Sequence, residues 1–197
     1  MAGEDLVYVV RQVFMRNPAE ERALLEVTAN LLARCHGLVS FNGRAFDVPL
    51  LTMRYALQRQ PSPLIDLPHF DLLPAARQRW RLRLSSCALS ALERDILEHS
   101  RSQEDVPGWL IPSLYSDYAR SAAAGSPSPP AIDDMTRVFY HNREDIISMV
   151  PLAAMLCSPF ENSGNDWLKQ PLHPVDCVSL GGCFEELGWH TTGELAY

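Results

Sequence analysis

The fold is decided by the stretch Leu38-Val-Ser-Phe-Asn-Gly-Arg-Ala-Phe-Asp-Val-Pro-Leu-Leu51. Residues 38–41 are mostly apolar and run into the pair Asn42-Gly43, a pattern typical of a short buried strand that ends in a turn. Pro49 then suits the first turn of a helix, where the missing N–H of proline leaves no hydrogen bond unmade. The stretch therefore predicts a strand, a turn and a helix, with Asp47 at the point where the helix begins.

Asp47 has two interpretations. A carboxylate at a helix start can accept the free N–H groups of the first turn, which is a purely structural role. A second stretch favours a functional role. Residues 139–149, Phe-Tyr-His-Asn-Arg-Glu-Asp-Ile-Ile-Ser-Met, open a long helix with apolar periodicity and place His141 and Asp145 four residues apart. Residues at this spacing lie on one face of a helix.

The composition predicts one domain with a proper core, followed by a tail. The chain has 197 residues, of which 47% are hydrophobic. Its net charge of −7 argues against a protein that coats nucleic acid by bulk electrostatics, but allows a local basic groove. The five cysteines form no Cys-x-x-Cys pair and no secretion signal is evident, which predicts reduced thiols in a cytoplasmic protein. No apolar run is long enough for a membrane helix.

Strands and helices are expected to alternate in the first half of the chain. Residues 6–14 are rich in β-branched and aromatic residues and predict a strand. Asn17 is expected to cap a helix that begins at Pro18 and runs to about residue 34. The strand 38–41, a helix over 48–58 and a third strand over 64–69 follow. This order predicts an α/β fold with a partly parallel sheet.

Helices dominate the second half. Asp71 is expected to cap a helix that runs to about Trp80, and further helices are predicted over 90–97, 111–124 and 133–156. The last of these has a set of apolar positions expected in the core: Val138, Ile146, Met149, Val150, Leu152, Ala153 and Leu156. A basic run has two interpretations, an exposed helix end or a set of phosphate contacts: Arg77, Arg79, Arg81 and Arg83.

The composition changes after residue 157. Residues 158–171 read as a linker and residues 172–197 as a helical hairpin. The spacing of His173, Cys177, Cys183 and His190 matches no compact zinc site. Residues 1–157 are therefore expected to form the main domain.

Two motifs resemble those of a known family. Asn42-Gly-Arg-Ala-Phe-Asp47 and Tyr140-His-Asn-Arg-Glu-Asp145 resemble the second and third motifs of the DEDD-type 3′–5′ exonucleases, and more narrowly the chain resembles the YprB ribonuclease H-like family. The resemblance extends through Val10-Arg-Gln12, Asn17-Pro-Ala-Glu-Glu21, Phe70-Asp-Leu-Leu73, Ala76-Arg77, Trp80, Leu92-Glu93, Val106-Pro-Gly108 and Tyr115. The segment containing Glu185-Glu-Leu-Gly188 is similar to tetratricopeptide-like helices.

The resemblance implies an RNase H-like mixed sheet flanked by helices, and a metal-dependent exonuclease. Such enzymes hold two Mg²⁺ or Mn²⁺ ions about 4 Å apart between carboxylates. Asp47 and Asp145 would be metal ligands, and His141 would orient or deprotonate the attacking water. Tyr140 is the alternative for that role, since the family's subclasses differ in this spacing.

The resemblance also implies partners and shows one departure. Asn42, Phe46 and the four arginines would contact a single-stranded end of DNA or RNA, and the C-terminal helices could bind a protein. The family's first motif, an Asp-x-Glu pair on a strand, would lie several tens of residues before residue 6, where this chain has only Met1 to Asp5. We therefore expect a fragment, a wrong start site or a degenerate relative with impaired activity. The alternative is a catalytically inactive nucleic-acid-binding or scaffold module.

Overall fold

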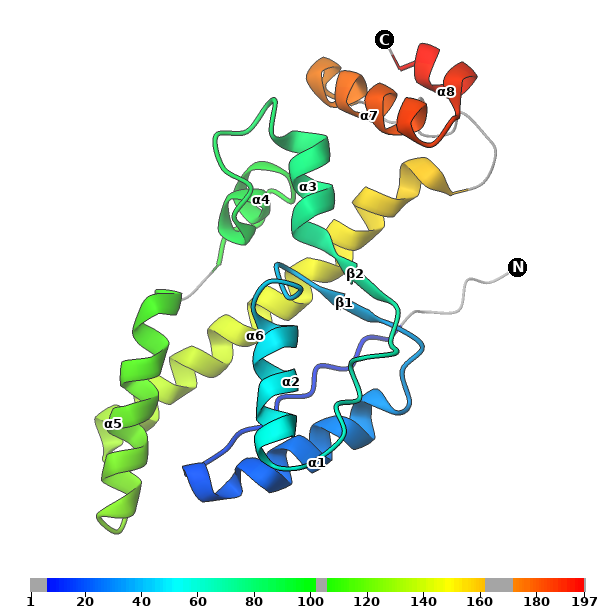
Figure 1. Cartoon of the computed structure of the whole chain (residues 1–197). Helices are drawn as coiled ribbons and strands as arrows, with labels where there is room; N and C mark the ends of the chain where they lie inside the picture. Colours follow the sequence, from blue (N-terminus) through cyan, green and yellow to red (C-terminus); the bar gives the residue numbers. More distant parts are fainter. Residues whose placement is uncertain (1–6, 102–105, 162–171, 197) are drawn as a thin grey trace.

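A long helix organises the computed structural model. This helix, α6 (Pro129–Cys157), begins with two prolines in its first turn, where neither removes a helical hydrogen bond. Figure 1 shows α5 (Ile111–Ala123) beside the first half of α6, and α7 (Pro174–Glu186) and α8 (His190–Glu194) near its far end. The structure describes residues 7–101, 106–161 and 172–196.

The deciding stretch forms a strand, a turn and a helix, as predicted. β1 (Leu38–Ser40) leads through the turn into α2 (Asp47–Leu57), and the chain returns in β2 (His69–Asp71). The two strands pair in parallel, with Leu38 opposite His69 and Ser40 opposite Asp71. Within the described ranges the sheet consists of these two strands. It is compatible with the predicted α/β class, and the larger mixed sheet stays a prediction.

The strand expected over residues 64–69 was placed too early. Residues 64–68 lie outside any strand, and β2 begins at His69. Pro68 explains the boundary, because its carbonyl accepts the N–H of Leu38 (2.8 Å) but its own nitrogen has no hydrogen to donate.

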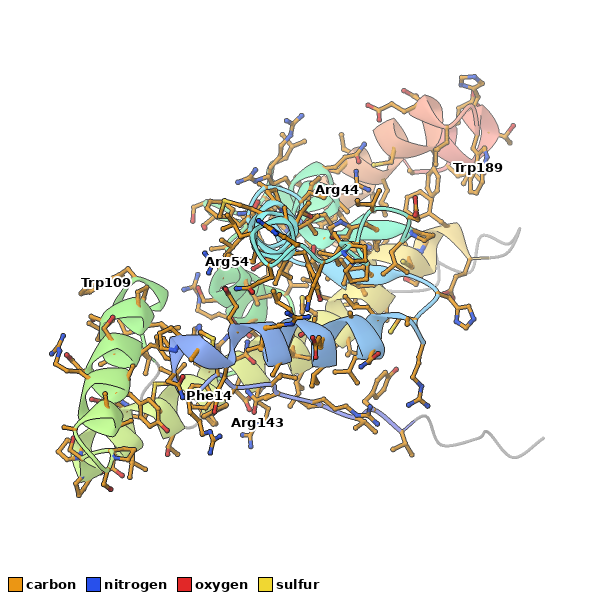
Figure 2. The ribbon with its side chains drawn as sticks, turned by 60° about the horizontal axis from the view of Figure 1, so that its bottom comes forward. Phe14, Arg44, Arg54, Trp109, Arg143 and Trp189 are labelled. Carbon is orange, nitrogen blue, oxygen red and sulfur yellow. The ribbon has the colours of Figure 1, made fainter. Side chains whose placement is uncertain are left out.

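The strand expected over residues 6–14 was wrong, because residues 7–14 have no regular secondary structure. This segment lies along α6 instead. The side-chain amide of Gln12 donates to the carbonyl of Phe139 (2.9 Å) and to Oδ1 of Asn142 (3.0 Å). The ring of Phe14 packs edge-on against Phe139, with 5.1 Å between ring centroids, and Figure 2 shows Phe14 beside α5 and α6. A β-branched sequence forms a strand only where a neighbouring strand can pair with it.

The helix that the stretch 38–51 begins, α2, packs against the helix that precedes β1. Asn17 caps the chain as predicted, accepting a hydrogen bond from the N–H of Ala19 (3.0 Å), but the first turn is a 3₁₀ helix, η1 (Pro18–Glu20), which continues into α1 (Glu21–Leu32). The hydroxyl of Tyr55 in α2 donates to the carbonyl of Leu25 in α1 (2.8 Å), and both residues are buried. This buried contact fixes α2 against α1.

The main core lies between α6 and two shorter helices, α3 (Leu72–Trp80) and α4 (Leu89–Asp95). Its buried members are Leu72, Ala76, Trp80, Leu92, Leu152 and Leu156. Met149 and Ala153 pack against this cluster, so much of the core predicted for α6 is confirmed. Ile146 is a correction, because it is 40% exposed and faces the cavity described below.

The C-terminal hairpin is formed by α7 and α8, which enclose a small cluster of Leu180, Phe184 and Ala196. Short 3₁₀ turns, η2 (Gly108–Leu110) and η3 (Ser158–Phe160), precede α5 and follow α6. Most of the predicted linker lies outside the described residues, and the tetratricopeptide-like character of the hairpin stays a prediction. None of the helices described here has the length and apolarity needed to cross a bilayer.

Candidate active site

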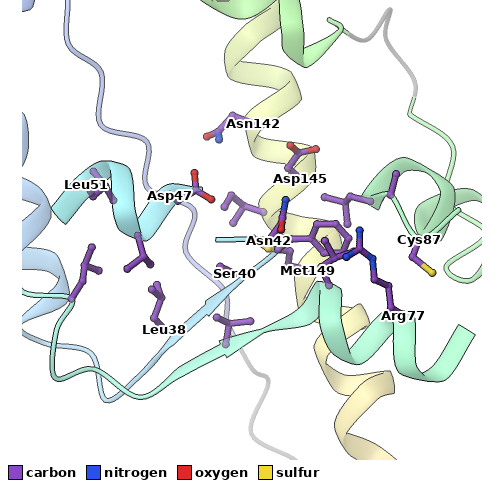
Figure 3. Close-up of a pocket in the computed structure, with 18 of the residues that line it drawn as sticks. Leu38, Ser40, Asn42, Asp47, Leu51, Arg77, Cys87, Asn142, Asp145 and Met149 are labelled. Atoms are coloured by element: carbon purple, nitrogen blue, oxygen red, sulfur yellow. The ribbon is translucent and has the colours of Figure 1, made fainter. Parts of the chain in front are cut away.

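The two predicted carboxylates line the same cavity. This cavity has a volume of about 1020 Å³ and is bordered by β1, the start of α2, α3, the segment before α4, and α6. Figure 3 shows Asp47 at the start of α2 and Asp145 on α6, with Asn42 and Arg77 also at the cavity. Residues from both motifs are therefore brought together by the fold.

Asp71 holds the loop that carries Asp47. Its Oδ1 accepts the N–H of Leu73 (3.2 Å), which confirms the predicted helix cap. The same oxygen accepts the N–H of Asn42 (2.7 Å), and Oδ2 accepts that of Arg44 (3.0 Å). Asn42 has a φ of 64°, a left-handed conformation that asparagine tolerates better than most residues. Asp71 thus fixes the turn between β1 and α2 in addition to capping α3.

Gly43 is required by close packing in this turn. A Cβ atom at this position would lie 2.4 Å from Oγ of Ser40, far inside contact distance. That hydroxyl accepts the N–H of Gly43 (3.2 Å) and lies 2.7 Å from Nε2 of His69. The carbonyl of Gly43 accepts the N–H of Val48 (2.9 Å), which starts α2. The turn is therefore tied both to β2 and to the helix that presents Asp47.

The capping interpretation of Asp47 is wrong. The cap position of α2 is Phe46, which makes no side-chain cap, and Asp47 is the first helical residue. Its side chain is exposed, and it accepts no hydrogen bond from any residue that the structure describes. Asp47 therefore presents a free carboxylate to the cavity.

Asp145 is held by a buried arginine. Nη2 of Arg101 contacts Oδ1 of Asp145 (2.5 Å) and Oε1 of Glu93 (2.8 Å), while Nε of Arg101 donates to Oε2 of Glu93 (3.0 Å). The side chains of Arg101 and Glu93 are only 10% and 3% exposed. Burial opposes the charge of Arg101, but the hydrogen bonds that Arg101 donates to Glu93 and Asp145 outweigh it and hold the pKa of Arg101 above its usual value. The charge of Asp145 is therefore compensated within the protein.

His141 lies behind Asp145 and is not among the residues that line the cavity. Its Nδ1 lies 3.0 Å from Nη1 of Arg101, and its Nε2 lies 3.3 Å from Oδ2 of Asp145. Because a guanidinium can only donate, Nδ1 is the acceptor, and the ring proton is left for Nε2, which faces the carboxylate. Tyr140, the alternative, lies under the guanidinium of Arg143, 5.1 Å from Cζ to the ring centroid.

The resemblance implies a site for two divalent cations, which need oxygen ligands. Oxygen donors suit Mg²⁺ and Mn²⁺, and Mg²⁺ is commonly bound through one or two carboxylates while it keeps several waters. Asp47 and Asp145, which line the same cavity, offer oxygen donors of this type for one such ion. They do not fit two, since no group of three His, Cys, Asp or Glu residues in the described ranges could hold a metal.

The basic run splits into two pairs. Arg77 lines the cavity and Arg81 is exposed. Arg79 is buried and donates to the carbonyl of Met155, and Arg83 forms a salt bridge with Asp176 (2.8 Å). Arg79 therefore joins α3 to α6, and Arg83 joins the segment after α3 to α7. The hypothesis of phosphate contact now rests on Arg77 and Arg81. Asn42 lines the cavity, and Phe46 is 67% exposed beside Asp47.

Sequence reasoning named Glu93 within the family resemblance but gave it no role, and it missed Arg101. Glu93 follows Ala91 and Leu92, which are buried, and a carboxylate next to such a pair was a signal that it needed a buried partner. Arg101 follows α4 by several residues and belongs to no recognisable motif. Its partners come from α4 and α6, so only the folded chain reveals the contact.

Comparison with known proteins agrees with this architecture. The model of the RNase H superfamily matches residues 2–157. The uncharacterized protein YprB of Bacillus subtilis (strain 168) is 34% identical over 152 residues, which cover 76% of this chain. The chain spans about a third of that relative, 34% of its length. No solved structure matches. With the family match extending over the whole main domain, the chain belongs to the RNase H superfamily.

Proposed function

We propose that this chain is a metal-dependent phosphodiester hydrolase of the 3′–5′ exonuclease type, acting on single-stranded ends of DNA or RNA. The observation that carries the proposal is the convergence of Asp47 and Asp145 on one cavity of about 1020 Å³. These residues come from two separate motifs, and superfamily membership favours a nuclease-like function. A cytoplasmic location and a protein partner at the C-terminal helices belong to the same proposal.

Each residue has a proposed role. Asp47 and Asp145 would hold the divalent cation, which would supply positive charge to stabilise the departing oxygen of the phosphodiester. Arg77 contacts a phosphate inside the cavity and Arg81 a phosphate outside it. Asn42 binds the nucleotide, and the exposed ring of Phe46 gives a base a surface for stacking.

His141 acts first on Asp145. Its Nε2 faces Oδ2 of Asp145, which orients the carboxylate. The role expected from the resemblance, orienting or deprotonating water, requires the ring to leave Arg101, because that contact occupies the lone pair of Nδ1. We propose the first role for the state seen in the structure and the second for the cation-bound state.

The test is a nuclease assay on end-labelled single-stranded DNA and RNA with Mg²⁺ or Mn²⁺. We expect weak activity that is lost on chelation and in Asp47→Asn and Asp145→Asn. Asp66→Asn, which changes an exposed carboxylate outside the cavity, should have no effect. Activity should rise in a version extended upstream by an Asp-x-Glu strand, because more carboxylates offset the repulsion between two cations. Hydrolysis that survives chelation and both substitutions would refute the proposal.

A second function, binding of nucleic acid without hydrolysis, is favoured by the pairing of Asp145 with Arg101. Binding of a single-stranded oligonucleotide would then persist in the presence of a chelator. Arg77→Ala and Arg81→Ala should each lower the slope of log affinity against log salt by about one unit. Arg120→Ala, which changes an exposed residue of α5, is the matched control. An unchanged slope in both cavity-side variants would exclude this function.

A further inference from the structure

The two carboxylates of the cavity differ in one chemical respect. Asp47 is exposed and accepts no hydrogen bond from the residues described here, whereas both oxygens of Asp145 are engaged. Oδ1 of Asp145 contacts Arg101 at 2.5 Å and Oδ2 faces His141 at 3.3 Å. A cation that approaches Asp145 therefore meets a carboxylate whose two oxygens each already face a side chain of the protein.

Glu93 fixes the position of Arg101 beside Asp145. Arg101 donates two parallel hydrogen bonds to Glu93, at 3.0 and 2.8 Å, the geometry in which arginine binds a carboxylate most specifically. Glu93 itself is 2% exposed, so this ion pair is shielded from water and from salt. The same nitrogen, Nη2, contacts both Glu93 and Asp145, which places the two carboxylates close together around one positive charge.

We propose that Arg101 is an internal counter-ion that competes with the divalent cation for Asp145 and so sets the metal affinity of the cavity. This inference rests on the proposed function of Asp47 and Asp145 as cation ligands. A cation that approaches Oδ1 of Asp145 has to displace the guanidinium or bind beside its positive charge. Glu93 keeps Arg101 anchored during that exchange, so Arg101 can return when the cation leaves.

The charge arithmetic gives the direction of the effect. A guanidinium next to Asp145 repels a divalent cation and occupies its ligand. Arg101→Gln removes the positive charge and leaves the negative charges of Asp145 and Glu93 uncompensated, so a cation should bind more tightly. Glu93→Gln should have the opposite effect. It removes one of the two carboxylates that balance the charge of Arg101, so the local potential becomes more positive and a cation should bind more weakly.

The experiment measures Mn²⁺ binding by isothermal titration calorimetry on the full chain, without nucleic acid. We expect Arg101→Gln to bind Mn²⁺ about tenfold more tightly than wild type, or more, because a unit charge at this range is screened only in part. Glu93→Gln should bind more weakly. Arg94→Gln is the matched control. It makes the same change in an exposed ion pair with Asp95 on α4, the helix that carries Glu93, and should leave the affinity unchanged.

A further variant tests the location. Arg101→Gln combined with Asp145→Asn should lose the gain in affinity. If Arg101→Gln does not fold, Arg101→Gln with Glu93→Gln replaces it, because this pair of changes leaves no unpaired buried charge. Tighter Mn²⁺ binding is again expected, because the guanidinium that contacts Oδ1 of Asp145 is gone. Wild-type affinity in the folded Arg101 variant, or a gain that survives Asp145→Asn, would overturn the inference.

Mn²⁺ affinity and hydrolysis test the counter-ion role of Arg101 and the exonuclease activity separately. Tighter Mn²⁺ binding in Arg101→Gln with no hydrolysis in any variant would refute the exonuclease and leave the counter-ion in place. Hydrolysis that depends on Asp47 and Asp145, together with unchanged Mn²⁺ affinity in Arg101→Gln, would refute the counter-ion and leave the exonuclease in place.

Discussion

The two walls of the cavity are built in opposite ways. On the α2 wall the backbone is held, by Asp71 and Ser40, while the carboxylate of Asp47 makes no hydrogen bond within the described residues. On the α6 wall the carboxylate of Asp145 is itself held, by Arg101 and His141. The first arrangement leaves a carboxylate without protein partners among the described residues. The second makes a carboxylate part of an internal network of hydrogen bonds, so substitutions on the two walls should have different costs.

The largest effect is expected at the centre of the α6 wall. Arg101→Gln leaves Glu93 buried without its charge partner, and loss of one member of a buried pair typically lowers the free energy of unfolding by about 3–5 kcal/mol. Urea denaturation followed by circular dichroism measures this change. Arg94→Gln, in an exposed pair, should change stability by less than about 0.5 kcal/mol. Equal effects of the two variants would contradict a buried role for Arg101.

The next effect is expected behind the α2 wall. Asp71→Ala removes the acceptor for three backbone N–H groups, those of Asn42, Arg44 and Leu73. We expect a loss of about 2–4 kcal/mol in the free energy of unfolding, because donors lose a charged partner. Thermal and urea unfolding measure it, with Asp66→Ala as the exposed control. A loss below 1 kcal/mol, on the scale of an exposed site, would mean that Asp71 does not hold the turn.

A smaller effect is expected from Gly43→Ala. The added Cβ would lie 2.4 Å from Oγ and 2.6 Å from Cβ of Ser40, so the turn must shift, at a cost of about 1–3 kcal/mol. Gly182 in α7 has open space around it, and Gly182→Ala should instead raise stability by about 0.5–1 kcal/mol. Differential scanning fluorimetry separates the two. Similar shifts in both variants would show that the turn accommodates a side chain.

The smallest effect is expected at Asp47. Asp47→Asn should change the free energy of unfolding by less than about 1 kcal/mol, since only the interaction of a charge with the helix start is lost. The same change at Asp145 should cost more, about 1–3 kcal/mol, because it weakens a charged hydrogen bond to Arg101. Urea denaturation of both variants gives the comparison. If Asp47→Asn is as destabilising as Asp145→Asn, the contrast between the walls is wrong.

The sequence predicted those features that depend on local signals. The turn at Asn42-Gly43, the start of α2 and the caps at Asn17 and Asp71 follow from residue types at fixed positions. The apolar spacing of α6 also placed Leu152 and Leu156 in the core.

Features set by distant partners could not be predicted in this way. Residues 7–14 have the composition of a strand, but Gln12 and Phe14 dock on α6 instead. Arg79 looked like a surface charge because nothing near it in sequence shows that α6 and α7 cover it. Arg101 likewise meets Glu93 and Asp145 only in the folded chain. Long side chains with several donors can bind partners far along the chain, and the local sequence pattern does not reveal which residues those partners are.

We propose that Asp47 and Asp145 bind one divalent cation between them. The most direct measurement is the anomalous scattering of crystals of the chain soaked in Mn²⁺. We expect an anomalous peak in the cavity, within about 2.0–2.6 Å of an oxygen from each carboxylate, and a guanidinium of Arg101 withdrawn from Oδ1 of Asp145. A cavity without manganese, or a peak that touches neither carboxylate, would contradict it.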